Sequence, residues 1–396
     1  MTKATIQQPH PPLAKKFDAV PLLDLQRQYR QIREEMLAAV ERVCSSQQFI
    51  LGVEVEALER EIAAFTGASA AVGCSSGTDA LWLALQAVGV QPGDAVITTG
   101  FSFLASASAI ARAGARPVFV DVDPETLNLD PARVEAKLRN GGSYQVRALL
   151  PVHLYGQCSD MDALQRIAAE FRLPIIEDAA QAIGAKWRDQ NAGALGAAAA
   201  FSFYPTKNLS AYGEAGLVTT RDLDWAEHIR RLRNHGMPRR YHHEEIGWNC
   251  RMDAIQAAIL RVKLPRIEKW NQQRRERAAA YARLLDNAGL ISAKEDSPVR
   301  PLHTSPHAYH VFHQYVIRAS QRDELRQFLS DRRIGTEIYY PVPLHLQPCF
   351  AYLGYSEGDL SESERAAREV LALPMFPELT EAEQKWVVES IGEFYS

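Results

Sequence analysis

The chain has 396 residues, of which 46% are apolar, and its 44 basic and 48 acidic residues give a formal net charge of −4. This apolar content is enough to bury a sizeable core, and the length favours one large domain with a smaller one. Because the charges are nearly balanced and spread along the chain, no basic surface for nucleic acid or membrane is indicated, and the longest apolar stretch is too short to cross a bilayer. Five cysteines without a CxxC pair argue against a zinc knuckle or a disulfide framework and favour a reducing cytoplasm.

The N-terminal segment, residues 1–19, lacks the apolar core of a signal peptide and is expected to be a loose tail. From Leu22 to Ala64, apolar residues recur at helical spacing, and Gly52 interrupts the pattern. This stretch predicts two helices that lead into the main domain.

Short β-rich runs then alternate with helical stretches. The runs are Ala95–Thr99, Pro117–Asp121, Ala148–Val152, Pro174–Glu177, Ala199–Phe203 and Leu217–Thr220. The helical stretches between them include Ala80–Ala87, Phe103–Arg112 and Met161–Phe171. This alternation predicts an α/β domain with a mostly parallel sheet covered by helices.

A long charged helical pattern from Asp253 to Asp286, interrupted at Pro265, is typical of a connection toward a second domain. Beyond it, a smaller α+β domain is predicted from His310–Ile317, Asp323–Arg332 and Glu381–Glu393. The expected division is therefore a tail over 1–19, a large domain over 20–270 and a small C-terminal domain over 271–396.

The run CSSGTDAL, from Cys74 to Leu81, places small polar residues and a glycine directly before an apolar helix. Backbone N–H groups at a helix start, together with the helix dipole, can hold a phosphate. The plain alternative is an ordinary capped helix, since Ser, Thr and Asp are common caps.

The run LPIIED, from Leu173 to Asp178, is an apolar strand that ends in two acids. Ligands of open α/β sheets gather at the carboxyl ends of strands, so Asp178 could face a ligand. The following AAQAIG has little bulk and leaves room for a flat ring. Without other signals, a solvated turn residue is the simpler interpretation of Asp178.

The run FSFYPTKNL places a lone lysine, Lys207, just after an apolar strand and before the loop Ser210–Gly216. Partial desolvation would lower the pKa of this amine and favour the neutral nucleophile, which can form an imine with an aldehyde. Taken alone, a lysine in a loop is more often a solvated surface charge.

A phosphate cradle, an acid at a strand end and a loop lysine, in that order, supply the three anchors that pyridoxal phosphate (PLP) needs at its phosphate, ring nitrogen and aldehyde. From about Val20 onward the chain resembles the DegT/DnrJ/EryC1/StrS family of sugar aminotransferases, a branch of the fold type I PLP enzymes. The motifs that carry the resemblance are SSGTDAL at Ser75, GFSFLAS at Gly100, PVHLYGQ at Pro151, EDAAQAIGA at Glu177, FSFYPTKNL at Phe201, RNHG at Arg233, GWNCRMDAIQAAIL at Gly247 and YYPVPLHLQ at Tyr339.

The resemblance implies a role for several positions. Lys207 is expected to be the Schiff-base lysine and proton shuttle, and Asp178 the partner that keeps the pyridine nitrogen protonated. Gln181 is expected to contact the ring hydroxyl and Phe103 to stack on the ring. The phosphate is expected to meet Gly77, Thr78 and Ser202, together with Asn249 supplied by the other subunit of a homodimer with shared active sites.

The resemblance also implies a substrate class: glutamate as amino donor and a nucleotide-linked keto sugar as acceptor, for surface polysaccharide or lipid. The stretch Arg239–Asp253 is most similar to enzymes that aminate carbon 3, including those for UDP-linked 2-acetamido-3-keto sugars. Arg251 and Tyr339 are the expected substrate contacts. A histidine is expected at the position of Tyr339 in enzymes for the uronic acid version, although Arg251 could still pair with a carboxylate. A dTDP-linked 3-keto-6-deoxy sugar is the main alternative.

Functions of other classes remain open at this stage. A dehydratase of the same fold is expected to have histidine in place of Lys207, and a non-catalytic regulator would have little reason to keep Lys207, Asp178 and Gln181 together. A metal-dependent glycosyltransferase would rest on Asp121 and Asp123 as a DxD motif, which fits better as a strand end before a turn. The run His242-His243-Glu244 lacks metal-ligand spacing, and no GxGxxG suggests a dinucleotide site. We expect no bound metal.

Overall fold

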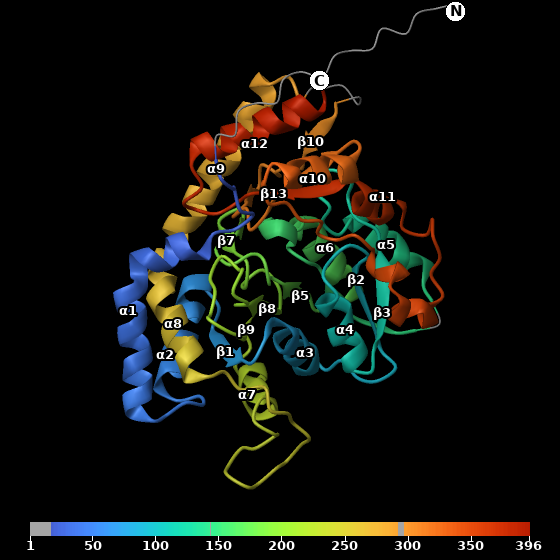
Figure 1. Ribbon diagram of the computed structural model, residues 1–396. Coiled ribbons are helices and arrows are strands. Elements are labelled where there is room, and N and C mark those ends of the chain that lie inside the picture. Colours follow the sequence, from blue (N-terminus) through green and yellow to red (C-terminus); the bar gives the residue numbers. More distant parts are fainter. Residues whose placement is uncertain (1–16, 143, 292–296) are drawn as a thin grey trace, which may run out of the picture.

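The computed structural model describes residues 17–142, 144–291 and 297–396 (Figure 1). The predicted pair of N-terminal helices is confirmed as α1 (Leu25–Ser46) and α2 (Val53–Thr66). Gly52 stands before α2 with a φ of 80°, a conformation that favours glycine and explains the break between the helices. Residues 1–16 of the expected tail lie outside the described residues.

The central sheet has the strand order β3-β2-β4-β5-β8-β9-β1. Its strands are β1 (Ala70–Cys74), β2 (Ala95–Thr99), β3 (Arg116–Val120), β4 (Val146–Leu150), β5 (Ile176–Asp178), β8 (Ala198–Ser202) and β9 (Gly216–Thr220). Strands β4 and β5 are joined through parallel bridges at Leu149–Ile175 and Val152–Asp178. Only β9 in this order is antiparallel to its neighbours, which confirms the mostly parallel sheet.

Helices cover both faces of this sheet, and alternate strand residues enter two different cores. Ala71, Ile97 and Leu149 pack in a core that includes residues of α2, α6 (Met161–Phe171) and α8 (Ala254–Lys263). The residues beside them in the strands pack with α3 (Gly77–Ala87), α4 (Ala105–Arg112) and α7 (Leu223–Leu232). Because successive side chains of a strand point to opposite faces, burial on both faces requires the nearly continuous apolar runs seen in the sequence.

Strand β1 was not among the predicted runs. Its sequence, AAVGC, contains one β-branched residue and a glycine, so it lacks the composition that marks strands. All of its residues are buried, and a Cβ on Gly73 would lie 3.1 Å from the Met252 side chain. Close packing against Met252 therefore favours a small residue in this strand.

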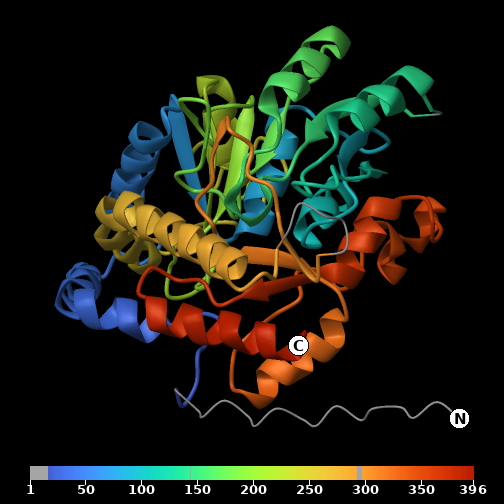
Figure 2. The ribbon, with the colours of Figure 1, turned by 90° about the horizontal axis from the view of Figure 1, so that it is seen from above.

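The predicted break near Pro265 is confirmed, because a short 3-10 turn (Leu264–Arg266) separates α8 from α9 (Ile267–Asn287). Beyond α9, an antiparallel sheet of β10 (Val299–Pro301), β12 (Tyr315–Ala319) and β13 (Val370–Leu373) packs with α10 (Arg322–Asp331) and α12 (Glu381–Phe394). These elements lie together beside the central sheet (Figure 2). The exact domain boundaries at 20 and 270 stay a prediction.

Three smaller groups of elements complete the described chain. Strands β6 (Lys186–Trp187), β7 (Gln190–Asn191) and β11 (Ala308–Tyr309) form a separate sheet, and α5 (Pro131–Asn140) lies between β3 and β4 in the sequence. Helix α11 (Ser361–Glu369) precedes β13. All five cysteines are free thiols, and none of the helices in the described ranges has the length and apolarity needed to span a membrane.

Candidate active site

The carboxyl ends of β1, β5 and β8 lie at the same edge of the sheet, because these strands run in the same direction. The three sequence-predicted anchors follow or end these strands: Gly77 after β1, Asp178 at the end of β5 and Lys207 after β8. The fold therefore gathers them at the edge where ligands of open α/β sheets bind.

The start of α3 forms the expected phosphate cradle. Ser76 is the N-cap, and its side chain accepts a hydrogen bond from the Asp79 N–H at 3.1 Å. Gly77 and Thr78 are the first helical residues, so their N–H groups have no earlier helical carbonyl to bind. A Cβ on Gly77 would lie 2.6 Å from the Ser202 Cβ, so only glycine lets α3 approach the end of β8 this closely.

Asp178 is buried at the end of β5, with 4% of its surface exposed. Its carboxylate accepts hydrogen bonds from the Ser106 hydroxyl at 2.7 Å and from the Ala180 N–H at 3.2 Å. Burial raises the pKa of Asp178, and these hydrogen bonds and the charge of Lys207 oppose the shift. Such a carboxyl is suited to pair with a buried cationic nitrogen. Sequence reasoning missed Ser106, although it is the last residue of the GFSFLAS motif.

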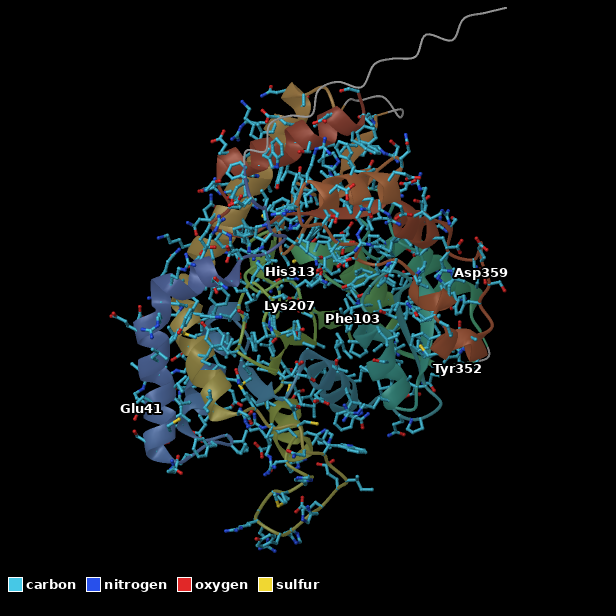
Figure 3. The ribbon with its side chains drawn as sticks, in the orientation of Figure 1. Glu41, Phe103, Lys207, His313, Tyr352 and Asp359 are labelled. Carbon is cyan, nitrogen blue, oxygen red and sulfur yellow. The ribbon has the colours of Figure 1, made fainter. Side chains whose placement is uncertain are left out.

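Lys207 lies in a loop after β8, and its backbone N–H donates to the Tyr204 carbonyl at 2.8 Å. Burial lowers the pKa of its amine to about 8, while the negative charge of Asp178 acts in the opposite direction. Figure 3 shows Lys207 between the elements of the C-terminal region and the sheet. The amine therefore has a substantial neutral, nucleophilic fraction near neutral pH.

Gln181 is fixed by two hydrogen bonds. Its side-chain oxygen accepts from the Tyr155 N–H at 2.5 Å, and its amide nitrogen donates to the Tyr340 hydroxyl at 3.1 Å. The Phe103 ring is more than half exposed and lies 6.1 Å from the Tyr340 ring, centroid to centroid. Phe103 and Gln181 are thus joined through one aromatic residue that sequence reasoning did not single out.

Tyr339 and Tyr340 occupy different places. The Tyr339 carbonyl accepts a hydrogen bond from the Tyr155 hydroxyl, and burial raises the pKa of the Tyr339 side chain. Tyr340 is the residue whose side chain contacts Gln181 and approaches Phe103, and burial also raises its pKa. The only sequence signal for Tyr340 was its position within YYPVPLHLQ.

Asn249 and Arg251 belong to a segment beside the phosphate cradle. The Cys250 carbonyl accepts from the Ser75 N–H at 3.1 Å, which places this segment next to the start of α3. Asn249 is exposed, and its side-chain oxygen accepts from Arg251 Nε at 3.1 Å. Arg251 also donates to Asn234 at 3.3 Å. Among the described residues, Asn249 has no hydrogen bond to Gly77, Thr78 or Ser202.

Glu177 and His153 form a buried hydrogen-bond network next to Asp178. Sequence reasoning did not single out either residue for this role. The Glu177 carboxylate accepts from the N–H groups of Gly193, Leu195 and Gly196 at 2.9, 2.9 and 2.7 Å, and it contacts His153 Nε2 at 2.9 Å. Both side chains are fully buried. Because the His153 N–H donates to the Asp178 carbonyl, this network also fixes the backbone at Asp178.

The DxD alternative is contradicted by the contacts of its two acids. The Asp121 carboxylate accepts from the N–H groups of Glu362 and Ser363 at 2.9 and 2.8 Å, so it caps the start of α11. Asp123 accepts from the N–H groups of Glu125 and Thr126 within its own turn. The contacts of Asp123 fit the predicted strand end before a turn, and the contact of Asp121 with α11 was not predicted. Within the described ranges, no cluster of His, Cys, Asp and Glu could hold a metal ion.

Comparison with known proteins extends these observations to the whole chain. The model of the DegT/DnrJ/EryC1/StrS aminotransferase family matches residues 30–392. A relative named pleiotropic regulatory protein, from Geobacillus stearothermophilus, is 53% identical over 95% of this chain and 98% of its own length. The dTDP-3-amino-3,4,6-trideoxy-alpha-D-glucose transaminase of Streptomyces venezuelae is 44% identical over 95% of this chain and 96% of the relative.

A UDP-linked relative and a solved structure are also similar. The UDP-N-acetyl-3-dehydro-alpha-D-glucosamine 3-aminotransferase of Acidithiobacillus ferrooxidans is 41% identical over 92% of this chain and 94% of the relative. The crystal structure of S. venezuelae DesV in complex with a ketimine intermediate superposes with a TM-score of 0.90 at 43% identity, covering 95% of this chain and 98% of that one.

The residues at the sheet edge fit PLP. Gly77 leaves space at a helix start suited to a phosphate, Asp178 is a buried acid for a ring nitrogen, and Lys207 is a desolvated amine for an aldehyde. The fold is that of the fold type I PLP enzymes. The chain therefore belongs to the DegT/DnrJ/EryC1/StrS aminotransferase family and is a PLP-dependent aminotransferase.

Proposed function

We propose that this enzyme moves an amino group from glutamate to the 3-keto carbon of a nucleotide-linked sugar, specifically a UDP-2-acetamido-3-keto hexose. The product would supply amino sugars for surface polysaccharide or lipid. The observation that carries the reaction type is the placement of Lys207 and Asp178 at one sheet edge, with the pKa of Lys207 lowered by burial. The similarity to a UDP-linked 3-aminotransferase supports the sugar class.

Each residue of the site has a defined role in this proposal. Lys207 holds the cofactor through its aldehyde carbon, and Asp178 holds the ring nitrogen as a cation. Gln181 binds the ring hydroxyl, and Phe103 covers one ring face. The phosphate is bound by the N–H groups and hydroxyls at Gly77, Thr78 and Ser202.

The bound cofactor supplies an electron-accepting ring and a carrier for the amino group. Glutamate would give up its amino group, take its new carbonyl oxygen from one water molecule and leave as 2-oxoglutarate. The keto sugar would then receive the nitrogen in place of its carbonyl oxygen, which leaves as water. Lys207, once free, would accept a proton from one carbon atom as the neutral amine and, as the resulting ammonium, deliver it to the other. Asp178 keeps its negative charge beside the ring nitrogen throughout.

The homodimer belongs to the proposal and rests on the segment that carries Asn249. This segment leads into α8, and two exposed apolar side chains from other parts of the chain lie next to the first residues of this helix. Ile50 is half exposed and bridges to Asp253, and the nearly half-exposed Tyr212 donates its N–H to Gln256. Exposed apolar residues around a polar centre are typical of an interface, and a second copy would cover them. Asn249 would then reach the partner's phosphate.

The sugar is expected to contact Arg251 and Tyr339. The relatives include both dTDP-linked and UDP-linked sugar enzymes, so a dTDP-3-keto-6-deoxyhexose is the second candidate. Arg251 is already bonded to Asn249 and Asn234, which supports a role in shaping the segment and gives it less freedom to bind a carboxylate. We therefore favour a sugar without a carboxylate.

A purely regulatory function is opposed by the site itself, although one relative carries a regulatory name. Lys207, Asp178 and Gln181 are all present, and burial has shifted the pKa of both ionisable groups. A regulator needs none of this chemistry. The five free thiols suit a reducing compartment, and we place the enzyme in the cytoplasm.

The test combines a substrate panel with one variant. The purified enzyme is incubated with glutamate and, in turn, a UDP-2-acetamido-3-keto hexose, its uronic acid analogue and a dTDP-3-keto-6-deoxyhexose, and 2-oxoglutarate is measured. Turnover is expected to be highest with the first sugar. Lys207→Ala should abolish turnover, because the amine for imine formation and proton transfer is lost. Wild-type turnover in this variant would reject the role of Lys207, and preference for the dTDP sugar would replace the favoured substrate.

A further inference from the structure

A second buried lysine lies close to the loop of Lys207. Lys263, the last residue of α8, has only 1% of its surface exposed. In the described part of the chain it forms no ion pair with a carboxylate. An ammonium group buried without a counter-ion is costly, so its position calls for a functional explanation.

Within the described ranges, the polar contacts of the Lys263 side chain all go to one loop. Its Nζ donates to the Ser210 carbonyl at 2.7 Å and contacts the Ser210 hydroxyl at 2.9 Å. The same Nζ lies 4.5 Å from the centre of the Tyr212 ring, the geometry of a cation–π contact. Lys263 therefore binds two residues that follow Lys207 closely in the sequence.

The loop that contains Ser210 and Tyr212, Phe203–Ala215, is short, and hydrogen bonds join its two ends. The Phe203 N–H donates to the Ala215 carbonyl at 2.9 Å, and the Ala211 N–H donates to the Phe203 carbonyl at 2.8 Å. On one side of Ser210, Asn208 donates to Asn271 at 2.8 Å. A displacement at Ser210 must therefore be taken up within a few residues of Lys207.

We propose that Lys263 is a positioning residue for Lys207: it holds the loop Phe203–Ala215 through Ser210 and Tyr212, and so sets where the Lys207 amine meets the cofactor. This inference rests on the proposed role of Lys207. Asn208 anchors the loop next to Lys207, and Lys263 anchors it at Ser210. With both anchors in place the amine is presented in one geometry, which lowers the entropic cost of binding the aldehyde.

The charge of Lys263 gives this role a pH dependence. Burial lowers the pKa of Lys263 to about 7. Below that pH the ammonium binds both Ser210 and the Tyr212 ring. Above it, the neutral amine still has two N–H groups for Ser210, but the attraction to the ring is lost.

Other charged and titratable groups around Lys263 are engaged elsewhere. Tyr212 faces it from the loop, and Tyr29 of α1 packs edge-on against Tyr212. The nearby acids of α1 and α2 bind arginines instead, in the pairs Glu35–Arg266, Glu54–Arg261 and Glu61–Arg261. The positive charge of Lys263 therefore interacts mainly with the Tyr212 ring.

The experiment measures PLP affinity of the apoprotein by absorbance titration from pH 6 to pH 9. Lys263→Met keeps a long unbranched side chain but removes the contacts with Ser210 and with the Tyr212 ring. It should weaken PLP affinity about tenfold. Ser210→Ala removes one of the two bonds and should weaken it about threefold. Lys269→Met, at an exposed position of α9, is the matched control and should bind PLP as the wild type does.

The pH profile separates positioning from a general loss of structure. The plot of wild-type PLP affinity against pH should show one inflection near pH 7, from Lys263, and another from Lys207. Lys263→Met should lose the inflection near pH 7 and keep the one from Lys207. Tyr212→Leu keeps an apolar side chain for the proposed dimer interface but removes the aromatic ring, so it should lose the inflection near pH 7 and keep wild-type affinity at pH 9. Wild-type affinity and profile in Lys263→Met would overturn the proposal.

If Lys263→Met does not fold, Ser210→Ala and Tyr212→Leu decide, because both leave Lys263 in place. Wild-type binding by both at every pH overturns the proposal. Failure of the Lys263 proposal can be told apart from failure of the proposed function. If the proposed function is wrong, Lys207→Ala keeps wild-type turnover, whatever the Lys263 variants show.

Discussion

Asp178 and Glu177 are adjacent on β5, and their side chains have different partners. The Asp178 carboxylate binds Ser106 of α4, whereas the Glu177 carboxylate binds three backbone N–H groups and His153. Successive residues of a strand point to opposite faces, which separates the two acids. Of the two acids in the motif, only Asp178 is therefore available to a ligand.

The Asp178 assignment predicts the effect of Asp178→Asn. The amide has nearly the same shape and can keep the Ser106 contact, but it cannot stabilise a cationic ring nitrogen. The variant should bind PLP and lose about a hundredfold or more in kcat. Steady-state kinetics measure this, and Asp162→Asn, an exposed acid of α6 that pairs with Arg188, is the control. Near-normal kcat in Asp178→Asn would move the role to another residue.

The lowered pKa of Lys207 predicts a pH-dependent rate of PLP capture. Only the neutral amine attacks an aldehyde, and the pKa of Lys207 is about 8. The second-order rate constant of the apoprotein with PLP should rise about tenfold per pH unit well below 8 and level off above it. Stopped-flow absorbance provides the rate. A curve that keeps rising to pH 10 would show that the amine is not desolvated.

At the residue scale, the placement of site residues could be predicted from the sequence where a local motif marks a strand end. Lys207, Asp178 and Gly77 each lie in a run that couples a strand end to a loop or helix. Tyr340 and Ser106 were missed because their roles come from contacts across the fold: Tyr340 binds Gln181 from a segment far along the chain. The roles of all the site residues, Asn249, Arg251 and Tyr339 included, stay predictions.

At the scale of elements, the close approach of α3 to β8 depends on Gly77. Gly77→Ala would bring its methyl group into Ser202, which must move, and the N–H groups that we propose bind the phosphate would move as well. PLP affinity should fall about tenfold or more. Gly392→Ala in α12 has open space around its Cβ and should leave affinity unchanged. Equal affinity of both variants and the wild type would exclude a tight cradle at Gly77.

Periodic elements were predicted closely, and irregular ones were not. Met161–Phe171 and Ala95–Thr99 match α6 and β2. The run His310–Ile317 was expected as a single unit, but strand β12 begins only at Tyr315. The preceding residues include His310 and His313, which are buried, and the carbonyl of His313 accepts from Arg274 at 3.2 Å. These tertiary contacts leave no periodic pattern in the sequence.

At the scale of the whole molecule, the proposed sharing of each site between two subunits predicts complementation between two inactive variants. Lys207→Ala lacks the amine, and Asn249→Ala is expected to lose the partner's phosphate contact and bind PLP too weakly for activity. In a mixed dimer, one site has both residues intact, so mixing the two variants should restore up to about a quarter of wild-type activity for random reassociation. Turnover after co-refolding measures this. The prediction fails if Asn249→Ala alone is inactive and mixed dimers form but stay inactive. Lys207 and Asn249 of one active site would then come from the same subunit.

The alternating α/β pattern and the break at Pro265 were enough to predict the architecture of the molecule. The order of strands in the sheet was beyond the sequence pattern, because it depends on which strands pair over long distances. The antiparallel insertion of β9 between β8 and β1 is an example. This insertion places β1 at the edge of the sheet, although the composition of β1 is not typical of a strand. Helix α3 begins shortly after β1 in the sequence.

The anchoring of Glu177 has a consequence for mapping this enzyme by mutational scanning. Among the described residues, its carboxylate meets only backbone N–H groups and His153, and most replacements leave several of these buried donors without an acceptor. A library scored by turnover alone would rank Glu177 beside Asp178, as if both took part in the chemistry. Scoring the same library for folded abundance would separate them, because loss at Glu177 would appear in abundance and loss at Asp178 in turnover per folded molecule.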